Sequence, residues 1–500
     1  MSQFINALND FIWGPPLIIL MLGTGLYFTI GSKFFQIRYF NYIMKQTLGK
    51  IFKKQDENNA EGVLSPLEAV STAIGGSVGF GNIAGVATAI AMGGPGATLW
   101  MWITAFLGMI LKQVEVTLAV YYRKKDENGD PYGGPTYYME RGLGEERNFK
   151  YWKVLATVFG FGIFSTFFIT ASNYTISEVV ASTFNINQMV ASLLIVICTY
   201  LMICKGMKYL GKIFTKLIPI MSISYLIFGL VIIFINYKNI PQSFMLIFKG
   251  AFTGTAAVGG FVGATISKVI STGMARSVYS NEAGWGTSPM VHASSQTVHP
   301  VEQGLWGSFE VFVDTFIVCT ITSLVVIVTG EWSSGVESAT LTLNAFSTGL
   351  GVFGTYFLTI TMLVFGLTTS SGWYVYYEVV LRHLCNKNIK LKNTVLKIFK
   401  YFYPLPGLLM TSYILYVGDI SIWTFVDITS GIPTFVNVLV LLVLSKQYFV
   451  LLKDYKARYL GVGKVDKNTK LFYEDIKGEK DDAYLLFNSF KSFINPLYIL

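Results

Sequence analysis

The chain has 500 residues, of which 52% are hydrophobic and only 13% charged, and it contains 48 glycines. A soluble domain carries about 25% charged residues, so this composition excludes a soluble globular protein and indicates a polytopic membrane protein. The net charge of +9 lies between apolar stretches, where it reports membrane orientation and not nucleic-acid binding. The three histidines have no metal-ligand spacing, and the chain shows neither a nucleophile elbow nor a P-loop, so it carries no enzyme signature.

Hydropathy predicts about eleven membrane-spanning helices, each of which needs about 20 apolar residues. The first segment lacks the basic start and the small-residue cleavage site of a secretory signal, so we expect a retained helix. The expected fold class is therefore all-α and polytopic. The predicted spans are 11–30, 65–92, 96–122, 152–180, 187–204, 210–236, 243–272, 302–330, 351–380, 396–417 and 420–446.

Lysine and arginine alternate between the predicted loops. The loop after the first span carries six of them, which marks the cytoplasmic side. The loops after spans three, five, seven, nine and eleven are also basic, with Arg276 in the loop after span seven, whereas residues 181–188 and 331–350 contain no Lys or Arg. An odd number of spans then predicts an outside N-terminus and a cytoplasmic C-terminus in a cell membrane, with residues 451–500 as a cytoplasmic tail of no assigned function.

Glycines interrupt the second predicted span. Each glycine costs a helix about 1 kcal/mol relative to alanine, and irregular backbone is tolerated in a bilayer only where it is buried in protein or lines a cavity. The stretch therefore predicts a cavity near the midplane. A half-helix beginning near Asn82 would direct N–H groups at a substrate carboxylate, and the carbonyls of Gly75 and Val78 would face a small cation. The alternative is close helix packing through glycines. The five glycines are Gly75, Gly76, Gly79, Gly81 and Gly85.

The ten spans after the first divide into two halves of five, and each half begins with a glycine-rich span. The second of these, 243–272, contains five glycines. Interrupted helices at matching positions of two halves are typical of inverted-repeat transporters. We therefore predict an N-terminal helix and loop (1–64), a first repeat (65–236), an inverted second repeat (237–450) and the tail (451–500).

Three stretches together resemble the bacterial and archaeal alanine or glycine:cation symporters, also called sodium:alanine symporters. They are Gly79 to Ala89 (GFGNIAGVATA), Gly93 to Trp102 (GGPGATLWMW) and Ala275 to Pro289 (ARSVYSNEAGWGTSP), and the run from Gly133 to Tyr138 (GGPTYY) fits as well. The resemblance covers roughly residues 10 to 450. It implies a leucine-transporter-like fold of the amino acid-polyamine-organocation superfamily, with sodium bound by the carbonyls of Gly75 and Val78 and by hydroxyls of the eighth core helix.

Three features depart from the family pattern. The family usually has Thr or Val at Phe80 and an aliphatic residue followed by Phe at Thr98-Leu99. A helix that often reads Gln-Ala-Asn or Gln-Ser-Asn reads Ala171-Ser172-Asn173 here. If that helix lines the pocket, these changes bear on the substrate and not on the fold.

A run of four hydroxyl side chains, Thr368 to Ser371, precedes Gly372 and Trp373 in an apolar span. Hydroxyl oxygens are hard ligands suited to sodium, although a single threonine in a membrane helix more often bonds the preceding turn. In the span that the resemblance assigns to the ion, Thr368 and Thr369 are the expected ligands, and Trp373 is expected to close the substrate pocket.

The expected substrate pocket has two walls. The first contains Gly79, Phe80, Gly81 and Asn82, with amides toward the carboxylate. The second comes from the glycine-rich span 243–272, where Phe261 would roof the pocket and Gly263 and Thr265 would border it. The alternative reading of Phe261 is a lipid-facing aromatic residue.

Ionisable residues inside spans are costly and often functional. Asp314 lies among apolar residues and is the strongest candidate, while Lys112 and Glu115, three apart, are expected to pair within one helix. Arg276 and Glu282 are expected to form a gate or structural pair at the cytoplasmic end of the second broken span. Neither glycine-rich break contains a carboxylate, which favours sodium over proton coupling.

The sequence thus predicts a secondary active transporter that imports a small neutral amino acid, alanine or glycine, with sodium as the coupling ion and no cofactor. A proton-coupled transporter of another amino acid and a non-transporting amino acid sensor are the open alternatives. A channel would need charge rings or a repeated filter, and a membrane enzyme would need matched catalytic side chains; the sequence shows neither.

Overall fold

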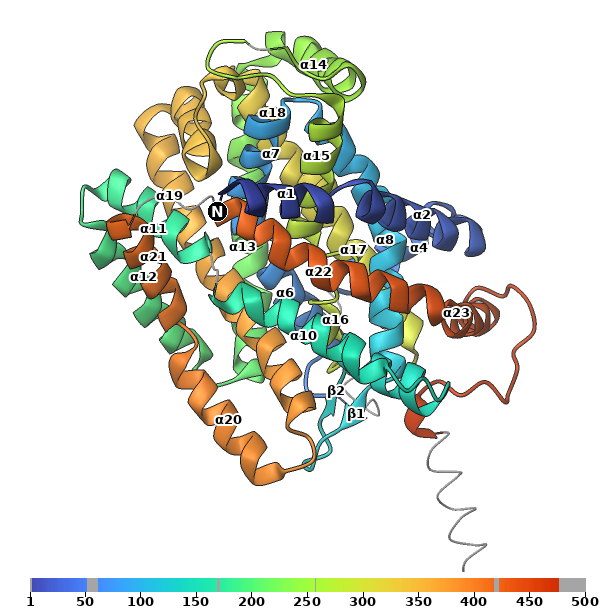
Figure 1. The fold of residues 1–500 in the computed structure, drawn as a ribbon. Helices are drawn as coiled ribbons and strands as arrows, with labels where there is room; N and C mark the ends of the chain where they lie inside the picture. Colours follow the sequence, from blue (N-terminus) through green and yellow to red (C-terminus); the bar gives the residue numbers. More distant parts are fainter. Residues whose placement is uncertain (1, 52–61, 169–170, 257, 418–421, 476–500) are drawn as a thin grey trace, which may run out of the picture.

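The computed structural model describes residues 2–51, 62–168, 171–256, 258–417 and 422–475 (Figure 1). These residues are almost entirely helical, apart from a small antiparallel hairpin of β1 (Lys124–Lys125) and β2 (Pro131–Tyr132). Seven of the described helices are long and apolar enough to cross a membrane, or eight if one bent pair counts as a single span. The all-helical membrane class is confirmed, and the number eleven stays a prediction.

Short helices at the two ends of the described chain pack on the outside of a central bundle. Helix α2 contacts α8 and α22, and α1 contacts α22 (Figure 1). The N-terminal helices are α1 (Ser2–Ile12), α2 (Pro15–Gly31), α3 (Phe35–Arg38), α4 (Phe40–Gln46) and α5 (Leu48–Ile51), and the last helix is α23 (Ser445–Tyr459).

The bundle is built from two sets of helices that correspond to the two predicted repeats. The first set is α6 (Pro66–Ser77), η1 (Gly81–Gly85), α7 (Val86–Gly93), α8 (Ala97–Tyr121), α9 (Pro135–Tyr138), η2 (Met139–Glu145), α10 (Trp152–Phe168), α11 (Ala171–Phe184), α12 (Gln188–Ile203) and α13 (Met207–Ile235). The second set is η3 (Tyr237–Asn239), α14 (Ile240–Thr253), α15 (Ile266–Asn281), α16 (Pro289–His292), α17 (Pro300–Val311), η4 (Phe312–Cys319), α18 (Thr320–Val328), η5 (Glu331–Ser333), α19 (Ser338–Leu384), α20 (Ile389–Phe402), α21 (Leu405–Val417) and α22 (Ile422–Val443). The division into repeats stays a prediction.

The first broken helix lies where the glycines predict it. Helix α6 begins with a capping box, in which Ser65 accepts from the Glu68 amide and the Glu68 side chain accepts from the Ser65 amide. It ends at Ser77, because Val78 adopts extended backbone angles. The chain then continues as η1 and α7, bent by 45° from α6. All residues from 69 to 90 are buried, so the irregular backbone is covered by protein as the bilayer requires.

The second break is not within 243–272. Helix α14 ends before Gly254, and residues 254–264 form a loop closed by the Thr255–Ala264 and Val258–Phe261 bridges, in which Val262 is 89% exposed. The break inside the bundle follows α15, where Gly284 and Gly286 both have φ +87. Glycine number alone does not distinguish these two uses, because both a tight loop and a helix break need positive φ.

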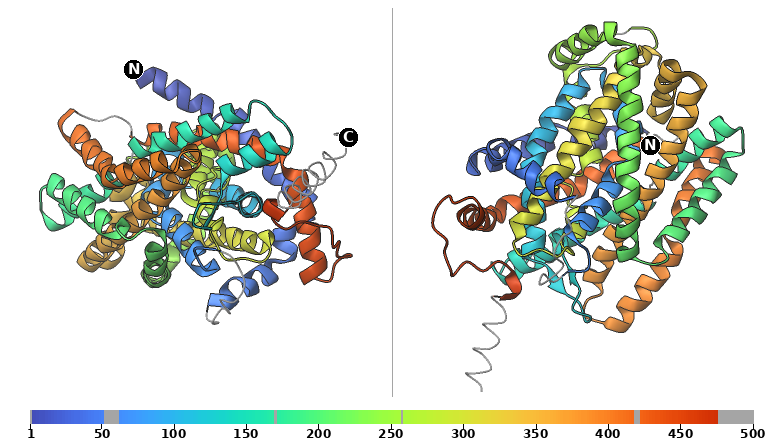
Figure 2. Two further views of the ribbon diagram at one scale, coloured as in Figure 1. Left: turned by 90° about the horizontal axis from the view of Figure 1, so that it is seen from below. Right: turned by 180° about the vertical axis from the view of Figure 1, so that it is seen from behind.

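The basic loops converge on one end of the molecule, which we call the basic face. Four printed ion pairs join them there: Lys50–Glu302 (2.8 Å), Arg382–Asp126 (3.4 Å), His383–Glu140 (2.8 Å) and Lys392–Glu127. At the opposite end the 254–264 loop meets η5, where the Gly260 amide donates to the Ser333 carbonyl (2.6 Å). Figure 2 shows this separation, with α14 at one end and α20 at the other. Arg276 does not belong to the basic face, because it is buried in α15.

Helices α6 and α19 cross in direct backbone contact. A Cβ at Gly372 would lie 2.8 Å from the Cα of Gly76, and a Cβ at Gly76 would lie 2.5 Å from the Tyr376 hydroxyl oxygen. Glycine is therefore required on both sides of the crossing, and the Thr368 to Ser371 run is held directly against the first break.

We predict that Gly372→Ala lowers the thermal stability of the detergent-solubilised protein by about 1–3 kcal/mol, because the added methyl group overpacks the crossing. The matched control is Gly23→Ala in α2, where an added Cβ meets nothing within 4 Å. Equal stability of the two variants would contradict this account of the crossing.

His299 on the basic face links α17 to α23 as a neutral side chain. Its Nδ1 accepts from the Val301 amide (3.1 Å) and so caps α17, and its Nε2 lies 3.3 Å from Asp454 Oδ2. Burial lowers the pKa of His299 to about 4, although Asp454 acts in the opposite direction.

Because the native pKa lies below that of the unfolded chain, the unfolded state binds the proton more readily, and stability is lost as the pH falls from about 6.5 toward 4. We predict that His299→Asn, which keeps a capping acceptor but does not titrate, flattens this part of the pH–melting-temperature curve. An unchanged curve in the variant would show that another group causes the loss.

Candidate substrate and cation site

The first break exposes backbone oxygen rather than a row of N–H groups. The amide of Gly79, which in a continuous helix would donate to the Gly75 carbonyl, donates instead to Asn82 Oδ1 (2.7 Å). The Asn82 amide nitrogen in turn donates to Asp314 Oδ1 (2.7 Å). The Asn82 side chain thus faces η4, and the Gly75 carbonyl loses its usual helical donor.

The hydroxyl run of α19 lies against this break. A Cβ at Gly79 would collide with Thr369 Oγ1. Thr368 Oγ1 donates to the Phe365 carbonyl (2.9 Å), whereas Thr369 Oγ1 is buried with no hydrogen-bond partner among the residues that the structure describes. An unpartnered buried hydroxyl beside a disrupted helix end is the kind of oxygen that a hard cation uses.

A cavity of about 80 Å³ lies next to Thr369. Aromatic side chains form much of its wall, and the rings of Trp285 and Trp373 meet edge to face at 4.9 Å. Its polar lining includes Ser172 and Asn173, which confirms that the Ala171-Ser172-Asn173 helix borders the pocket. Asn173 is held in place because its Oδ1 accepts from the Ser192 and Thr411 hydroxyls. The other lining residues are Thr166, Phe167, Val196, Thr199, Tyr279, Ser370, Tyr377, Tyr403, Pro404, Gly407 and Val426.

The second break supplies a wall that the sequence did not identify. Tyr279 and Trp285 flank the break after α15 and line the cavity. A Cβ at Gly81 would lie 3.3 Å from the Ser280 Cα, so the two breaks adjoin. The ARSVYSNEAGWGTSP stretch carried the family resemblance, and its glycines with positive φ are the signal that locates these residues.

The predicted site residues fall into two groups. Thr369 and Trp373 line the cavity, and Gly79 contacts Thr369. The structure does not bring the second predicted wall to this cavity. Phe261 packs against Trp332 (5.8 Å between ring centroids), Gly263 belongs to the same outer loop, and Thr265 caps α15. The reason is the misplaced second break: these three residues precede α15 instead of following it.

Arg276 and Asp427 separate the cavity from a second one. The two side chains form a double ion pair, with 2.6 Å between Nη1 and Oδ1 and 2.8 Å between Nη2 and Oδ2. Asp427 lines an outer cavity of about 310 Å³ that also includes Thr265 and Lys268. Its neighbour Val426 lines the inner cavity. Arg276 therefore pairs with Asp427, not with Glu282, whose carboxylate accepts from Thr287 Oγ1 (2.6 Å).

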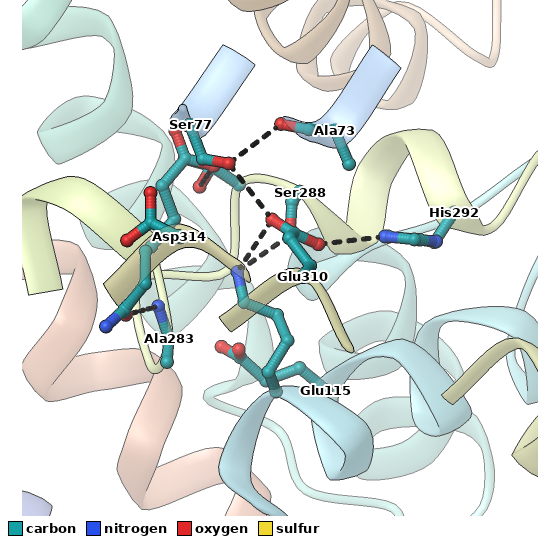
Figure 3. A network of polar contacts seen from close by, with 12 residues as sticks. Ala73, Ser77, Glu115, Ala283, Ser288, His292, Glu310 and Asp314 are labelled. Carbon is teal, nitrogen blue, oxygen red and sulfur yellow. Dashed lines mark hydrogen bonds and ion pairs between the residues drawn. The ribbon is translucent and has the colours of Figure 1, made fainter. Parts of the chain in front are cut away.

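A buried carboxylate of α17 joins the ends of both broken helices (Figure 3). Glu310 accepts from Ser77 Oγ (3.4 Å) at the end of α6 and from Ser288 Oγ (3.3 Å) at the end of the second break. It also contacts His292 Nε2 (3.0 Å) and Lys112 Nζ (3.8 Å).

The predicted pairing of Lys112 with Glu115 inside α8 is therefore wrong. Lys112 pairs with Glu310 and donates to Ser288 Oγ (2.7 Å). Glu115 accepts from the Gly284 amide (3.1 Å) and from Asn437 Nδ2 (2.6 Å). Both side chains reach other helices, because α8 packs against α15 and α17 along much of its length.

Asp314 makes a second connection of this kind. It accepts from Asn82 Nδ2 and from Ser280 Oγ (2.9 Å), so it links the start of η1 to the end of α15. The prediction that Asp314 is a special intramembrane residue is consistent with this position, and its side chain is fully buried.

A model of the sodium:alanine symporter family matches residues 1–469. The chain belongs to this family. It is accordingly a membrane transporter and not an enzyme, and sodium-coupled amino-acid symport is the activity class of the family.

Two relatives and one solved structure illustrate the match. The sodium/alanine symporter AgcS of Methanococcus maripaludis is 34% identical, over 96% of this chain and 99% of that protein. The probable sodium/glutamine symporter GlnT of Bacillus subtilis is 33% identical, over 95% and 94%. The crystal structure of MhsT in complex with L-phenylalanine aligns with a TM-score of 0.55 at 13% identity, covering 77% of this chain and 90% of that one. This last likeness confirms the leucine-transporter-like fold.

We predict that Glu310→Gln lowers stability by about 3–5 kcal/mol, because it leaves the Lys112 charge buried without its partner. Adding Lys112→Met to that variant is expected to restore much of the loss. Thermal unfolding of both variants is the measurement, with the exposed Glu337→Gln as a control. Equal losses in the single and double variants would contradict the pairing.

Proposed function

We propose that this transporter imports a small neutral amino acid, alanine or glycine, together with sodium. The observation that carries the proposal is the contact between the first helix break and Thr369, beside a small cavity walled by Trp285 and Trp373. One oxygen-rich position and one enclosed pocket thus share a border, which is the arrangement that ion-coupled binding needs.

The sodium ligands in this proposal are the carbonyls of Gly75 and Val78 and the hydroxyls of Thr368 and Thr369. Three facts support the set: the Gly75 carbonyl has lost its helical donor, Val78 leaves helical geometry, and Thr369 Oγ1 is buried and unpartnered among the described residues. All four are oxygen ligands without net charge, which suits a monovalent hard cation.

The amino acid would lie in the cavity with its carboxylate toward the start of η1, which begins at Gly81 next to Gly79 and Thr369. The positive end of a helix attracts a carboxylate. Trp285 and Trp373 would limit the side chain, and the fixed Asn173 amide would contribute a polar contact. Of the predicted substrate residues, Gly79, Phe80, Gly81, Asn82 and Trp373 remain in this proposal, and Phe261, Gly263 and Thr265 do not.

The proposed orientation has the basic face in the cytoplasm, in line with the positive-inside rule. The N-terminus is then outside and the C-terminal tail inside. The outer cavity with Lys268 faces the exterior, and the Arg276–Asp427 pair closes the inner cavity on that side.

Substrate binding by the purified protein, measured over a panel of amino acids in sodium or in a large inert cation, tests the proposal. We expect alanine or glycine to bind only in sodium. A different amino acid that still requires sodium would keep the mechanism and change the substrate, as the name of the glutamine relative illustrates. Sodium-independent binding would favour proton coupling, and binding without flux would favour a sensor.

We predict that Thr369→Val, which removes the hydroxyl at nearly constant volume, weakens sodium-dependent binding by about tenfold or more. The matched control is Thr394→Val on exposed α20, which is expected to bind like the unmodified chain. Unchanged sodium dependence in Thr369→Val would remove this residue from the ion site.

A further inference from the structure

The C-terminal segment Phe472–Asp475 lies against the basic face beside the β1–β2 hairpin (Figure 2). The Tyr473 ring packs on Tyr121 and Tyr122, with ring centroids 6.4 and 5.5 Å apart, and Tyr473 is only 8% exposed. The segment begins after residue 469, where the family match ends. It is therefore an addition to the shared transporter core that the fold itself does not require.

Cations of the core hold this segment. The Arg123 guanidinium lies 4.6 Å from the Phe472 ring centroid, and that of Arg141 lies 5.4 Å from the Tyr473 ring centroid. The Glu474 carboxylate lies 3.5 Å from Arg141 Nη2 and accepts from the Lys125 amide (3.0 Å). Aromatic, ionic and backbone contacts thus converge on four consecutive residues, which is a specific docking site.

The surface beneath the segment connects to both broken helices. Arg123 donates to the Ser295 carbonyl (2.9 Å), just after α16. The amide of Val63, just before α6, donates to the Ser294 carbonyl (2.9 Å), and the Gln296 amide donates to the Leu64 carbonyl (2.8 Å). The docked segment therefore reinforces the place where the ends of the two broken helices meet α8.

The same surface connects to α19. Asp126 in the hairpin pairs with Arg382 at the end of α19 (3.4 Å), and Glu127 pairs with Lys392 in α20. Opening of the basic face requires the helices around the two breaks to move relative to α19 and α20. Contacts that exist only in the closed arrangement favour that arrangement by their differential free energy.

We propose that residues 472–475 act as a built-in brake, which docks on Tyr121, Tyr122, Arg123 and Arg141 and slows opening of the transporter toward the cytoplasm. The proposal rests on the transport function and on the orientation proposed above. It does not concern the substrate or ion ligands, which lie elsewhere in the structure.

The test uses the full-length chain with Tyr473→Ala, Glu474→Ala and the double variant. The matched control is Asp475→Ala, which removes an adjacent exposed carboxylate whose side chain makes no printed contact within the described residues. Hydrogen exchange of the peptide that contains the Lys125 amide reports docking directly, because that amide donates to Glu474. Sodium-driven alanine uptake into liposomes reports the brake.

We expect faster exchange at Lys125 and an initial uptake rate raised roughly threefold or more in the double variant, with equilibrium alanine binding unchanged and the Asp475→Ala control behaving like the unmodified chain. Unchanged exchange in the double variant would overturn the docking. Faster exchange with an unchanged uptake rate would overturn the brake and leave the transport function standing. Absence of sodium-driven uptake in the unmodified chain itself would defeat the proposed function, and the brake with it.

Discussion

The structure depends on one constraint: a helix that breaks inside a membrane must have its released backbone groups satisfied by protein or by a ligand. At the break after α6, the Asn82 side chain takes the Gly79 amide, and the Gly75 carbonyl is left for another partner. The tight crossing of α6 and α19 then brings Thr369 to the same place. A site for a cation follows from the way in which the break is satisfied.

The buried charges serve the same arrangement. Glu310 and Asp314 lie three to five residues from the middle of one continuous region, α17 and η4, and each accepts hydrogen bonds from both broken helices. Lys112 supplies the opposing charge to Glu310. Buried ion pairs add little stability compared with apolar packing, but they fix one geometry, because removing one partner is costly. The two breaks are therefore held in register by α8 and α17.

Much of this could be predicted from the sequence. The glycine cluster at 75–85 located the first break, and the hydroxyl run with Trp373 located the facing part of α19, because each combines an unusual composition with an apolar span. The second break could not be located in the same way. The glycines at 254–263 serve an exposed loop, whereas only Gly284 and Gly286 mark the break between α15 and α16.

Pairings between distant helices were also beyond the sequence. Lys112 and Glu115 have the spacing of an intrahelical pair, yet each reaches a different helix, since the neighbours of α8 are set by tertiary packing. The partnership of Arg276 with Asp427 spans 151 residues of sequence. No local pattern encodes a contact of that separation, so the closure between the two cavities emerges only from the fold.

The central claim is that sodium and the amino acid bind in adjoining parts of one site. The most direct test is the reciprocity of their affinities in purified protein, measured as alanine affinity against sodium and sodium affinity against alanine. The account predicts that each ligand raises the affinity of the other by the same factor, as linkage requires, and that the factor collapses in Thr369→Val. Alanine affinity that does not change with sodium would contradict it.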